Sequence, residues 1–259
     1  MGNTYFLVPG WGFPHGTITL GSVIINSMHP QLALFEPPHP VQVTTAVKTR
    51  FTSTRDDPAD RKSGLFRTFL SLFGLGDEDG FHNDRKKPIV AYSIWDLQSL
   101  SFVPTDELKI KAIIETERVA QFLKASDNRP SVFMVTGIKS IRGASVLTAS
   151  NKGPGWTAEI RVGLEKESRE GKPVVFAFEV LQLRLSDTGD ITTVSDILEP
   201  LEKLQRRLDH EFGEAAFTAL GTTDEQTGDT CQVIAPSPAP VDLLTASSAR
   251  IDASLAHDI

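Results

Sequence analysis

The residues best suited to catalysis or metal binding are scattered along this chain. Its six histidines show neither the H-x-x-x-H spacing nor the neighbouring cysteine pairs that are typical of zinc ligands. They are His15, His29, His39, His82, His210 and His257. The one cysteine, Cys231, lies in an acidic stretch without a nearby histidine to activate it. The sequence therefore predicts no metal centre, no catalytic thiol and no cofactor.

Two glycine-containing motifs match catalytic or nucleotide-binding signatures in part, but their context differs. GASVL, around Ser145, lacks the last glycine of a nucleophile elbow because Leu147 takes that place. GPGWTA, residues 153–158, fits a dinucleotide-binding pattern, yet the alternation that follows it is typical of a strand. Its glycines therefore predict a hairpin turn. We predict that the protein is not an enzyme.

Basic residues give a stronger indication, because they gather in two strand-rich parts of the chain. Near a membrane, each Lys or Arg attracts anionic lipid with roughly 1 kcal/mol. The residues predicted to contact lipid are Lys48, Arg50, Arg67, Arg85, Lys86, Lys87, Lys139, Arg142, Lys152 and Arg161. Taken singly, each has the ordinary interpretation of a solvated charge. Nucleic acid is not a predicted partner, because the net charge is −7 and no recognition motif accompanies these residues.

An apolar arm, FLVPGWGFP at residues 6–14, precedes the first regular pattern. Its prolines and glycines exclude a helix, and aromatic rings on such a loop suit the headgroup zone of a membrane. The predicted membrane-anchor residues are Phe6, Leu7, Trp11 and Phe13. The alternative is that these side chains pack in the core of a soluble domain.

The composition is that of a globular protein with an uneven distribution of charge. The chain has 259 residues, of which 40% are hydrophobic and 23% charged, enough to bury a sizeable core. Its apolar runs fall far short of the roughly 20 residues of a membrane-spanning helix, so we expect a cytoplasmic location for the inactive protein. Residues 186–259 carry four Lys and Arg against fourteen Asp and Glu, so they form an acidic module on a mildly basic body.

Hydrophobic periodicity predicts long strands interrupted by short helices. Strict alternation over residues 41–52 predicts an amphipathic strand, with Phe51 on its apolar face. Residues 63–74 follow as a short apolar helix, and residues 105–126 as a longer helix with Thr105 as its N-cap. The remaining predictions are strands at 88–104 and in several runs over 131–185, and an amphipathic helix within 194–220. From Gly221 onward we predict an acidic linker and tail, so that the domains are 1–220 and 221–259.

Several of these strings are similar to the gasdermin family of pore-forming proteins, in particular to its short fungal members, which regulate cell death in allorecognition (heterokaryon incompatibility). The strings are PHGTITLGSVI and PQLALFEP near the N-terminus, FMVTGIKSIRGASV at residues 133–146, and VVFAFEVLQLRL at 174–185. The resemblance runs from about Phe6 to Phe217. It implies an α+β fold, with a twisted, mainly antiparallel sheet and surrounding helices.

The resemblance also implies a mechanism of lytic, pyroptosis-like cell death. Two strand-helix-strand segments, here about 41–102 and 131–185, would refold into membrane-crossing hairpins, and a ring of protomers would enclose a pore at the plasma membrane. Backbone within hydrocarbon must be fully hydrogen-bonded, so the inserted strands must pair around a closed ring. Lipid-facing candidates are Val47, Phe51, Trp95, Trp156, Ile160 and Val162. The alternating pattern also fits a half-buried soluble sheet.

The chain departs from the family's larger members, which carry a separate inhibitory domain. Two triggers stay open on the sequence. Either the acidic C-terminal part restrains the basic body until a protease cuts within 213–240, or a non-identical allelic partner activates the protein by hetero-oligomerisation. The alternative function, from a different class, is a soluble lipid- or protein-binding module that does not insert into the membrane.

Overall fold

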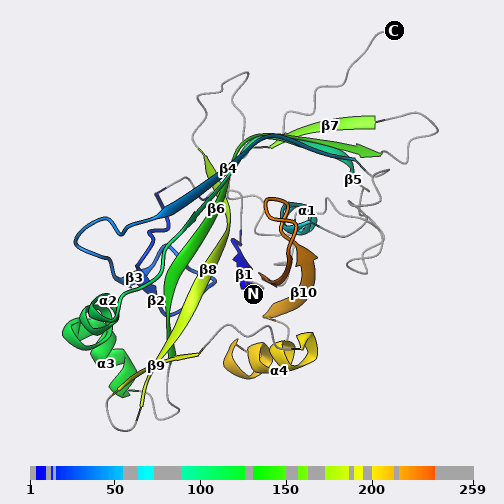
Figure 1. The fold of residues 1–259 in the computed structure, drawn as a ribbon. Coiled ribbons are helices and arrows are strands. Elements are labelled where there is room, and N and C mark those ends of the chain that lie inside the picture. Colours follow the sequence, from blue (N-terminus) through cyan, green and yellow to red (C-terminus); the bar gives the residue numbers. More distant parts are fainter. Residues whose placement is uncertain are drawn as a thin grey trace.

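The main feature of the fold is one large sheet with helices packed around it (Figure 1). The computed structural model describes residues 4–9, 13, 16–54, 64–72, 89–125, 131–149, 157–162, 173–186, 190–194, 200–212 and 216–236. Among the described strand pairs, β1 with β11 is parallel and the others are antiparallel. The predicted fold class, α+β with a mainly antiparallel sheet, is confirmed.

The described strands follow the order β10-β11-β1-β8-β6-β2-β3, with β4, β5, β7 and β9 joined to the sides of this path. Their bounds are β1 Thr4–Leu7, β2 Val23–Ile24, β3 Ala33–Phe35, β4 Thr44–Thr54, β5 Ile89–Ser101, β6 Ser131–Ala149, β7 Thr157–Val162, β8 Val174–Leu185, β9 Ile191–Val194, β10 Phe217–Thr223 and β11 Thr230–Pro236. The long alternating strands predicted near 41–52 and 88–104 are thus β4 and β5.

Strand β6 is the spine of the sheet, because its 19 residues pair with four other strands. Along one edge it meets β2 and then β5. Along the other edge it meets β8 as far as Ile141, and from Ala144 it meets β7 instead. Beyond that point, the described sheet consists of β4, β5, β6 and β7 side by side. The fold therefore separates a broad central sheet from a narrower four-stranded extension.

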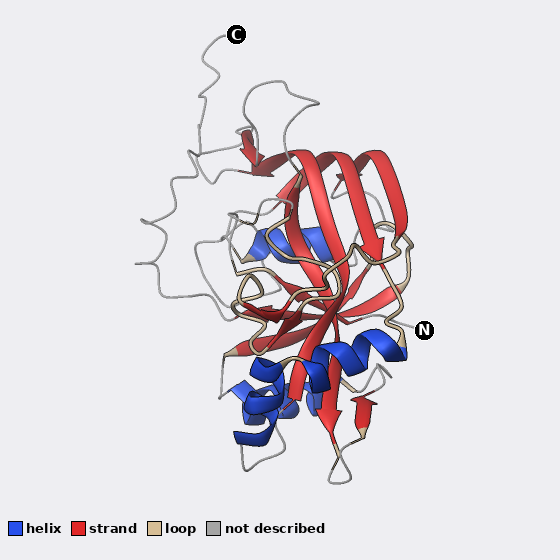
Figure 2. Ribbon diagram, turned by 90° about the vertical axis from the view of Figure 1, so that its left-hand side faces the viewer, coloured by secondary structure: helices blue, strands red, loops and turns tan. Residues whose placement is uncertain are grey.

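The extension bends where the partners of β6 change. Gly143 has φ 58°, and Arg50 is the one described non-glycine residue with a positive φ, at 53°. The registers of β4 with β5 and of β5 with β6 place Arg50, Trp95 and Gly143 in one row across three strands. Positive φ in a strand turns the backbone sharply. The extension curves over a helix as a result (Figure 2).

That helix is α1, Leu65–Ser71, and it fills the concave side of the bent strands (Figure 1). Its residues 65–70 are buried. The Phe66 ring lies 5.5 Å from the ring of Tyr92 on β5 and 5.4 Å from that of Phe176 on β8, measured between centroids. Aromatic pairs of this kind stabilise by about 0.5–1.5 kcal/mol each beyond their burial. The short apolar helix predicted at 63–74 is therefore a core element between the extension and the central sheet.

The predicted helix at 105–126 is divided into three pieces. Thr105 caps α2, Asp106–Ile110, as expected, because its hydroxyl accepts a hydrogen bond from the Leu108 amide. A π-helical turn, Lys111–Glu115, follows, and then Thr116 takes an extended conformation before α3, Glu117–Ala125. The amphipathic helix predicted within 194–220 is α4, Leu201–Phe212, which buries Leu204 and Leu208.

The C-terminal part of the described chain belongs to the central sheet. Strands β10 and β11 form a hairpin, and β11 pairs with β1 from Thr4↔Gln232 to Phe6↔Ile234. Cys231, Val233, Ile234 and Ala235 are buried. The prediction that a linker begins at Gly221 is therefore wrong for residues 222–236. This part of the chain contains two strands joined by a polar turn. Their apolar residues complete the core beside the N-terminal strand β1.

Candidate functional site

The residues predicted to contact lipid lie in several different environments. Arg50 is exposed on β4, and Lys48 and Arg142 are half-buried on β4 and β6. Arg67 and Lys139 are buried, with exposed fractions of 5% and 2%. Arg161 belongs to β7, and its side chain lies outside the described residues, as do Arg85, Lys86, Lys87 and Lys152. Among the predicted lipid contacts whose side chains the structure describes, Arg50, Lys48 and Arg142 are therefore the most accessible to solvent.

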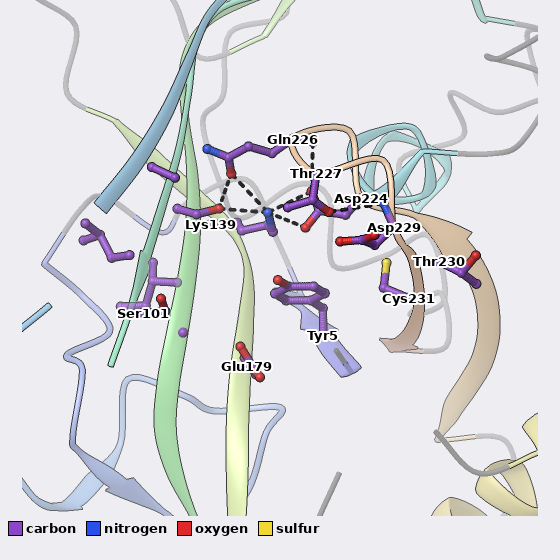
Figure 3. A pocket seen from close by; sticks show the side chains of 15 residues that line it. Tyr5, Ser101, Lys139, Glu179, Asp224, Gln226, Thr227, Asp229, Thr230 and Cys231 are labelled. Atoms are coloured by element: carbon purple, nitrogen blue, oxygen red, sulfur yellow. Dashed lines mark hydrogen bonds and ion pairs between the residues drawn. The ribbon is translucent and has the colours of Figure 1, made fainter. Parts of the chain in front are cut away.

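The interpretation of Arg67 and Lys139 as lipid contacts is wrong for this conformation, because both side chains are enclosed by protein. The Arg67 guanidinium lies within the core under the extension, 5.8 Å from the centre of the Tyr92 ring. Lys139 points from β6 toward the turn between β10 and β11 (Figure 3). A cation loses its hydration on burial and requires a partner of opposite charge. For Lys139 that partner is Asp224.

Lys139 and Asp224 form a buried ion pair at the centre of a polar cluster. The Lys139 Nζ lies 2.8 Å from Asp224 Oδ2 and 3.0 Å from Oδ1, and both side chains are more than nine-tenths buried. The same ammonium donates to Ser99 Oγ at 2.8 Å and to Gln226 Oε1 at 3.3 Å, and it lies 5.2 Å from the centre of the Tyr5 ring. Ser99 in turn donates to Gln226 Oε1. All three donor hydrogens of the ammonium have acceptors.

Glu225, the next residue in the turn, points its carboxyl group toward α1 and β5. Its Oε1 accepts hydrogen bonds from the Phe66 amide at 2.6 Å and from the Tyr92 hydroxyl at 3.4 Å. Its main-chain oxygen accepts from Lys48 Nζ at 2.7 Å. Desolvation raises the pKa of this carboxyl group from 4.5 to about 7, an effect that the neighbouring Asp224 adds to and that Lys139 partly opposes.

A cavity of about 200 Å³ lies beside this cluster (Figure 3). Lys139, Asp224 and Gln226 line it together with Tyr5, Glu179 and Cys231. Burial and the nearby acids raise the pKa of the Cys231 thiol to about 12. That thiol therefore stays protonated at neutral pH, as expected for a cysteine without a catalytic role.

Two basic residues of β4 lie against aromatic rings. The Arg50 guanidinium lies 5.4 Å from the centre of the Trp95 ring, and Lys48 Nζ lies 4.4 Å from that of Phe51. Val47 and Trp95 are exposed, at 54% and 38%. Cations stacked on aromatic rings beside apolar side chains form a surface suited to the boundary between headgroups and hydrocarbon.

Two predicted anchor residues of the N-terminal arm are core residues. Phe6 and Leu7 belong to β1, between β8 and β11, and Phe6 stacks on Phe178 with ring centroids 5.7 Å apart. The anchor interpretation is therefore wrong for both in this conformation, because strand pairing on both sides fixes them inside the sheet. Phe13 is partly buried against the same core, and Trp11 lies outside the described residues.

The residues of the turn, Asp224 to Asp229, were not predicted as partners of the basic side chains. The signal was present, since two short runs that contain apolar residues, FTALGTT and TCQVIAP, flank the polar segment DEQTGD, a pattern typical of a hairpin. Composition obscured it, because the segment lies in an acidic region rich in Ser, Thr and Pro. Which basic residues the turn would meet depends on strand pairing far apart in the sequence.

Comparison with protein-family models and with curated proteins gives no match. Among solved structures, the chain is similar to a bacterial gasdermin from Bradyrhizobium tropiciagri, with 15% sequence identity over 59% of this chain and 69% of that chain and a TM-score of 0.26. A TM-score this low does not establish a shared fold. Within the part of the chain that the structure describes, no helix is long and apolar enough to span a membrane.

Proposed function

We propose that the protein is a pore-forming effector of lytic cell death, which binds acidic phospholipids, oligomerises and inserts β-hairpins into the membrane. The observation that carries this proposal is the four-stranded extension of the sheet. It consists of long strands held over the body mainly by side-chain contacts, and it presents apolar and cationic side chains outward. The similarity of the sequence strings to the gasdermin family supports the same proposal.

The lengths of the strands meet the physical requirement for crossing a bilayer. A tilted membrane-crossing strand needs roughly 9–11 residues. Strands β4, β5, β6 and β8 have 11, 13, 19 and 12 residues. The inserted hairpins would come from β4–β5 and from β6 with the segment that follows it, and Val47 and Trp95 would face lipid. Strand β7 would gain residues from its flanking segments.

The edges of the extension support oligomerisation. Among the described residues, β4 pairs with β5 alone and β7 with β6 alone. An edge strand presents a row of backbone donors and acceptors that can pair with another chain. A second copy, or a non-identical allelic variant, would supply the strand that pairs there. In hydrocarbon this pairing becomes obligatory, because unsatisfied backbone groups cost several kcal/mol each.

Activation would move the protein from the cytoplasm to the plasma membrane. The proposed triggers are contact with an allelic partner or proteolytic removal of a C-terminal segment. A cut upstream of β11 would remove a strand of the central sheet, so productive cleavage would fall after Pro236.

The direct test is release of an encapsulated dye from liposomes containing phosphatidylserine, with neutral phosphatidylcholine liposomes as the control. We would compare the full chain, a chain ending at Pro236, and a mixture of the full chain with a divergent homologue. Dye release restricted to anionic liposomes, with ring-shaped assemblies by electron microscopy, is the expected result. Co-sedimentation with liposomes in all three cases without leakage would instead identify a binding module that does not insert.

Charge reversal at Arg50, which is exposed, and at Arg142, which is half-buried, tests the proposed lipid contact. Arg50→Glu combined with Arg142→Glu should reduce co-sedimentation with anionic liposomes by about tenfold or more, since each basic residue contributes roughly 1 kcal/mol and reversal adds repulsion. Arg118→Glu, an exposed change on α3, is the matched control. Unchanged binding of the double variant would place the lipid contact elsewhere on the molecule.

A further inference from the structure

We propose that the turn between β10 and β11, residues 224–229, is an internal latch that holds β4 and β5 to α1 and to β6. Release of the turn would be the step that frees β4 and β5 to move. Only the purpose of the latch rests on the proposed function. The contacts that form the latch belong to the protein before any contact with a membrane. Residues 224–229 are called the latch turn below.

The latch turn contacts β4, α1, β5 and β6. Glu225 accepts hydrogen bonds from Lys48 on β4, from the Phe66 amide in the first turn of α1, and from Tyr92 on β5. Gln226 bonds to Ser99 on β5, and both Asp224 and Gln226 bond to Lys139 on β6. Three consecutive residues of the turn thus contact four elements, β4, α1, β5 and β6, all of which are distant in sequence from the turn. An ordinary hairpin turn would need none of these contacts.

The latch turn is rigid, so its side chains are presented in a fixed arrangement. The Asp224 amide donates to the Asp229 carbonyl at 2.9 Å, and the Gly228 amide donates to the Asp224 carbonyl at 2.7 Å. The Gln226 amide donates to Asp224 Oδ1 at 2.9 Å. Gly228 has φ 79°, a conformation that glycine adopts without strain. Because these bonds lie within the turn, they persist when the turn leaves its partners, and the turn can move as a unit.

The latch turn and α1 are in close contact. A bridge joins Gly64, the residue before α1, to Thr223, the last residue of β10. A Cβ at Gly64 would collide with the side chain of Glu225. Thr68 on α1 and Thr222 on β10 approach each other through their hydroxyl groups, at 3.5 Å. Glycine at position 64 therefore provides the space that the Glu225 carboxyl group occupies.

The contacts of the latch turn are mostly polar, so they can form and break reversibly. Apolar packing holds α1 to β8, but the latch turn contacts β4, β5 and β6 through hydrogen bonds and, at Lys139, through an ion pair. Polar contacts of this kind can be exchanged for water or for other polar partners without exposing apolar surface. Glu225 is a weak point of the contact, since its carboxyl group is influenced by Asp224 as well as by Lys139, bonds to Tyr92, and has its charged form disfavoured by burial. The latch turn is thus suited to release.

Hydrogen-deuterium exchange of the full chain tests the latch without any membrane. The test variant replaces residues 224–229 by Asn-Gly, a two-residue turn that preserves the β10–β11 hairpin, and adds Lys139→Met so that no unpaired charge stays buried. Gln226→Ala is a milder variant that leaves all charges in place. Lys109→Met is the matched control, because its ion pair with Asp106 on α2 has a similar distance, 3.1 Å, but is exposed on the Asp106 side.

The expected result is selective. Exchange in β4 and β5 should rise by about tenfold or more in the turn-replacement variant and less in Gln226→Ala, whereas β1 and β8 should keep their protection. Lys109→Met should behave as the unaltered protein does. Unchanged exchange in β4 and β5 would overturn the proposal. An equal rise in all strands would also overturn it, because the turn would then be an ordinary part of the cooperative core.

Dye release from anionic liposomes separates this inference from the proposed function. If the turn-replacement variant exchanges faster in β4 and β5 and leaks dye faster than the full chain, both proposals are supported. If its exchange rises without leakage from any form of the protein, the latch stands and the pore-forming function fails. If the full chain leaks dye but the exchange of β4 and β5 does not respond to the turn, the latch fails and the pore-forming function stands.

Discussion

At the residue scale, burial decides the role of each basic side chain. Lys139 on β6 and Arg50 on β4 belong to one sheet, with β5 between their strands, and look equivalent in the sequence. Lys139 points into the molecule, where desolvation obliges it to pair with Asp224, whereas Arg50 lies in solvent over the Trp95 ring. The acidic-restraint hypothesis requires contacts between acids of the C-terminal region and the basic body. The pair of Asp224 with Lys139 is one such contact.

Glu225 makes the stability of the protein depend on pH near neutrality. Its folded-state pKa, about 7, exceeds the ordinary value of 4.5, so the folded protein holds this proton more tightly than the unfolded chain does. The stability contributed by the protonated carboxyl group is complete below pH 4.5 and is lost as pH rises through 7. Glu225→Gln, a neutral substitute of the same shape, should raise the melting temperature at pH 8 and change it little near pH 5.

Thermal unfolding followed by circular dichroism between pH 5 and 8 measures this effect. Glu36→Gln, at an exposed position outside the helices and strands, is the control, and its melting curve should follow that of the unaltered chain at every pH. A melting temperature for Glu225→Gln that is lowered equally at pH 5 and pH 8 would contradict the prediction. Glu225 would then act as a charged acceptor whose loss weakens the turn at all pH values.

The sequence could indicate these residues only in part. Alternation on β4 correctly predicted a strand that carries basic residues, because period two is a local property of the backbone. It could not say that the ladders would bring residue 139 next to residue 224, since that contact depends on pairing of strands separated by most of the chain. The same limit applies to Phe6, whose partners Phe133, Phe178 and Phe217 come from three distant strands.

At the element scale, the bend of the extension depends on one row of residues. Gly143 adopts φ 58° where β6 changes partners, and Arg50 adopts φ 53° two strands away. A residue with a Cβ loses about 1–2 kcal/mol in this conformation, whereas glycine does not. Arg50 therefore carries strain in the bent form that would be relieved if β4 became a regular strand. The bend is the part of the extension that straightening would change most.

Gly143→Ala should weaken the bent form. The alanine penalty in the left-handed region predicts a loss of about 1–2 kcal/mol of unfolding free energy, together with faster hydrogen exchange in β7 and in β6 beyond residue 143. Gly16→Ala is the matched control, because Gly16 has φ 94° with open space around it and lies in a loop away from the bend. Its unfolding free energy should fall by a similar amount without faster exchange in the extension. Equal exchange patterns in the two variants would show that the bend does not depend on position 143.

The predicted elements differ from the observed ones mostly where local and tertiary preferences compete. The helix cap at Thr105 could be predicted from the sequence because capping involves residues that are close together in the chain. The π-helical turn at Lys111–Glu115 and the break at Thr116 interrupt an otherwise helical pattern, and nothing in the spacing of its apolar residues predicts them. Strands β10 and β11 were not predicted because each is short. They are buried by contacts with β1 and α4, which the local sequence does not indicate.

At the scale of the whole molecule, the N-terminal and C-terminal parts of the described chain form one structural unit. Strand β1 lies between β8 and β11, and Gln205 on α4 fastens β10 from its outer side through bonds to the Phe217 carbonyl and the Ala219 amide. Removal of β11 would take Val233 and Ile234 out of the core and leave one edge of β1 unpaired. On the proposed function, a boundary between a pore-forming body and a regulatory tail would lie after Pro236.

Two truncations locate this boundary. A chain ending at Gly221 should lose cooperative unfolding, because burial of each large apolar side chain of β11 contributes roughly 1.5–3 kcal/mol to a total stability of about 5–15 kcal/mol. A chain ending at Pro236 should melt within a few degrees of the full chain, because it keeps every described strand. Calorimetry and size-exclusion chromatography measure both outcomes. A folded, cooperative chain ending at Gly221 would contradict the role assigned to β11.

The chain ending at Pro236 also decides which restraint operates, because it keeps the latch turn and lacks residues 237–259. Dye release by this chain at the rate of the full protein would mean that the restraint resides in contacts within 4–236. Among these contacts, the latch turn joins the C-terminal hairpin to β4, β5 and β6 through polar groups. Faster release would place the restraint in residues 237–259 and favour proteolysis as the trigger. Combining this truncation with the Asn-Gly turn should then accelerate release further only if the two restraints act separately.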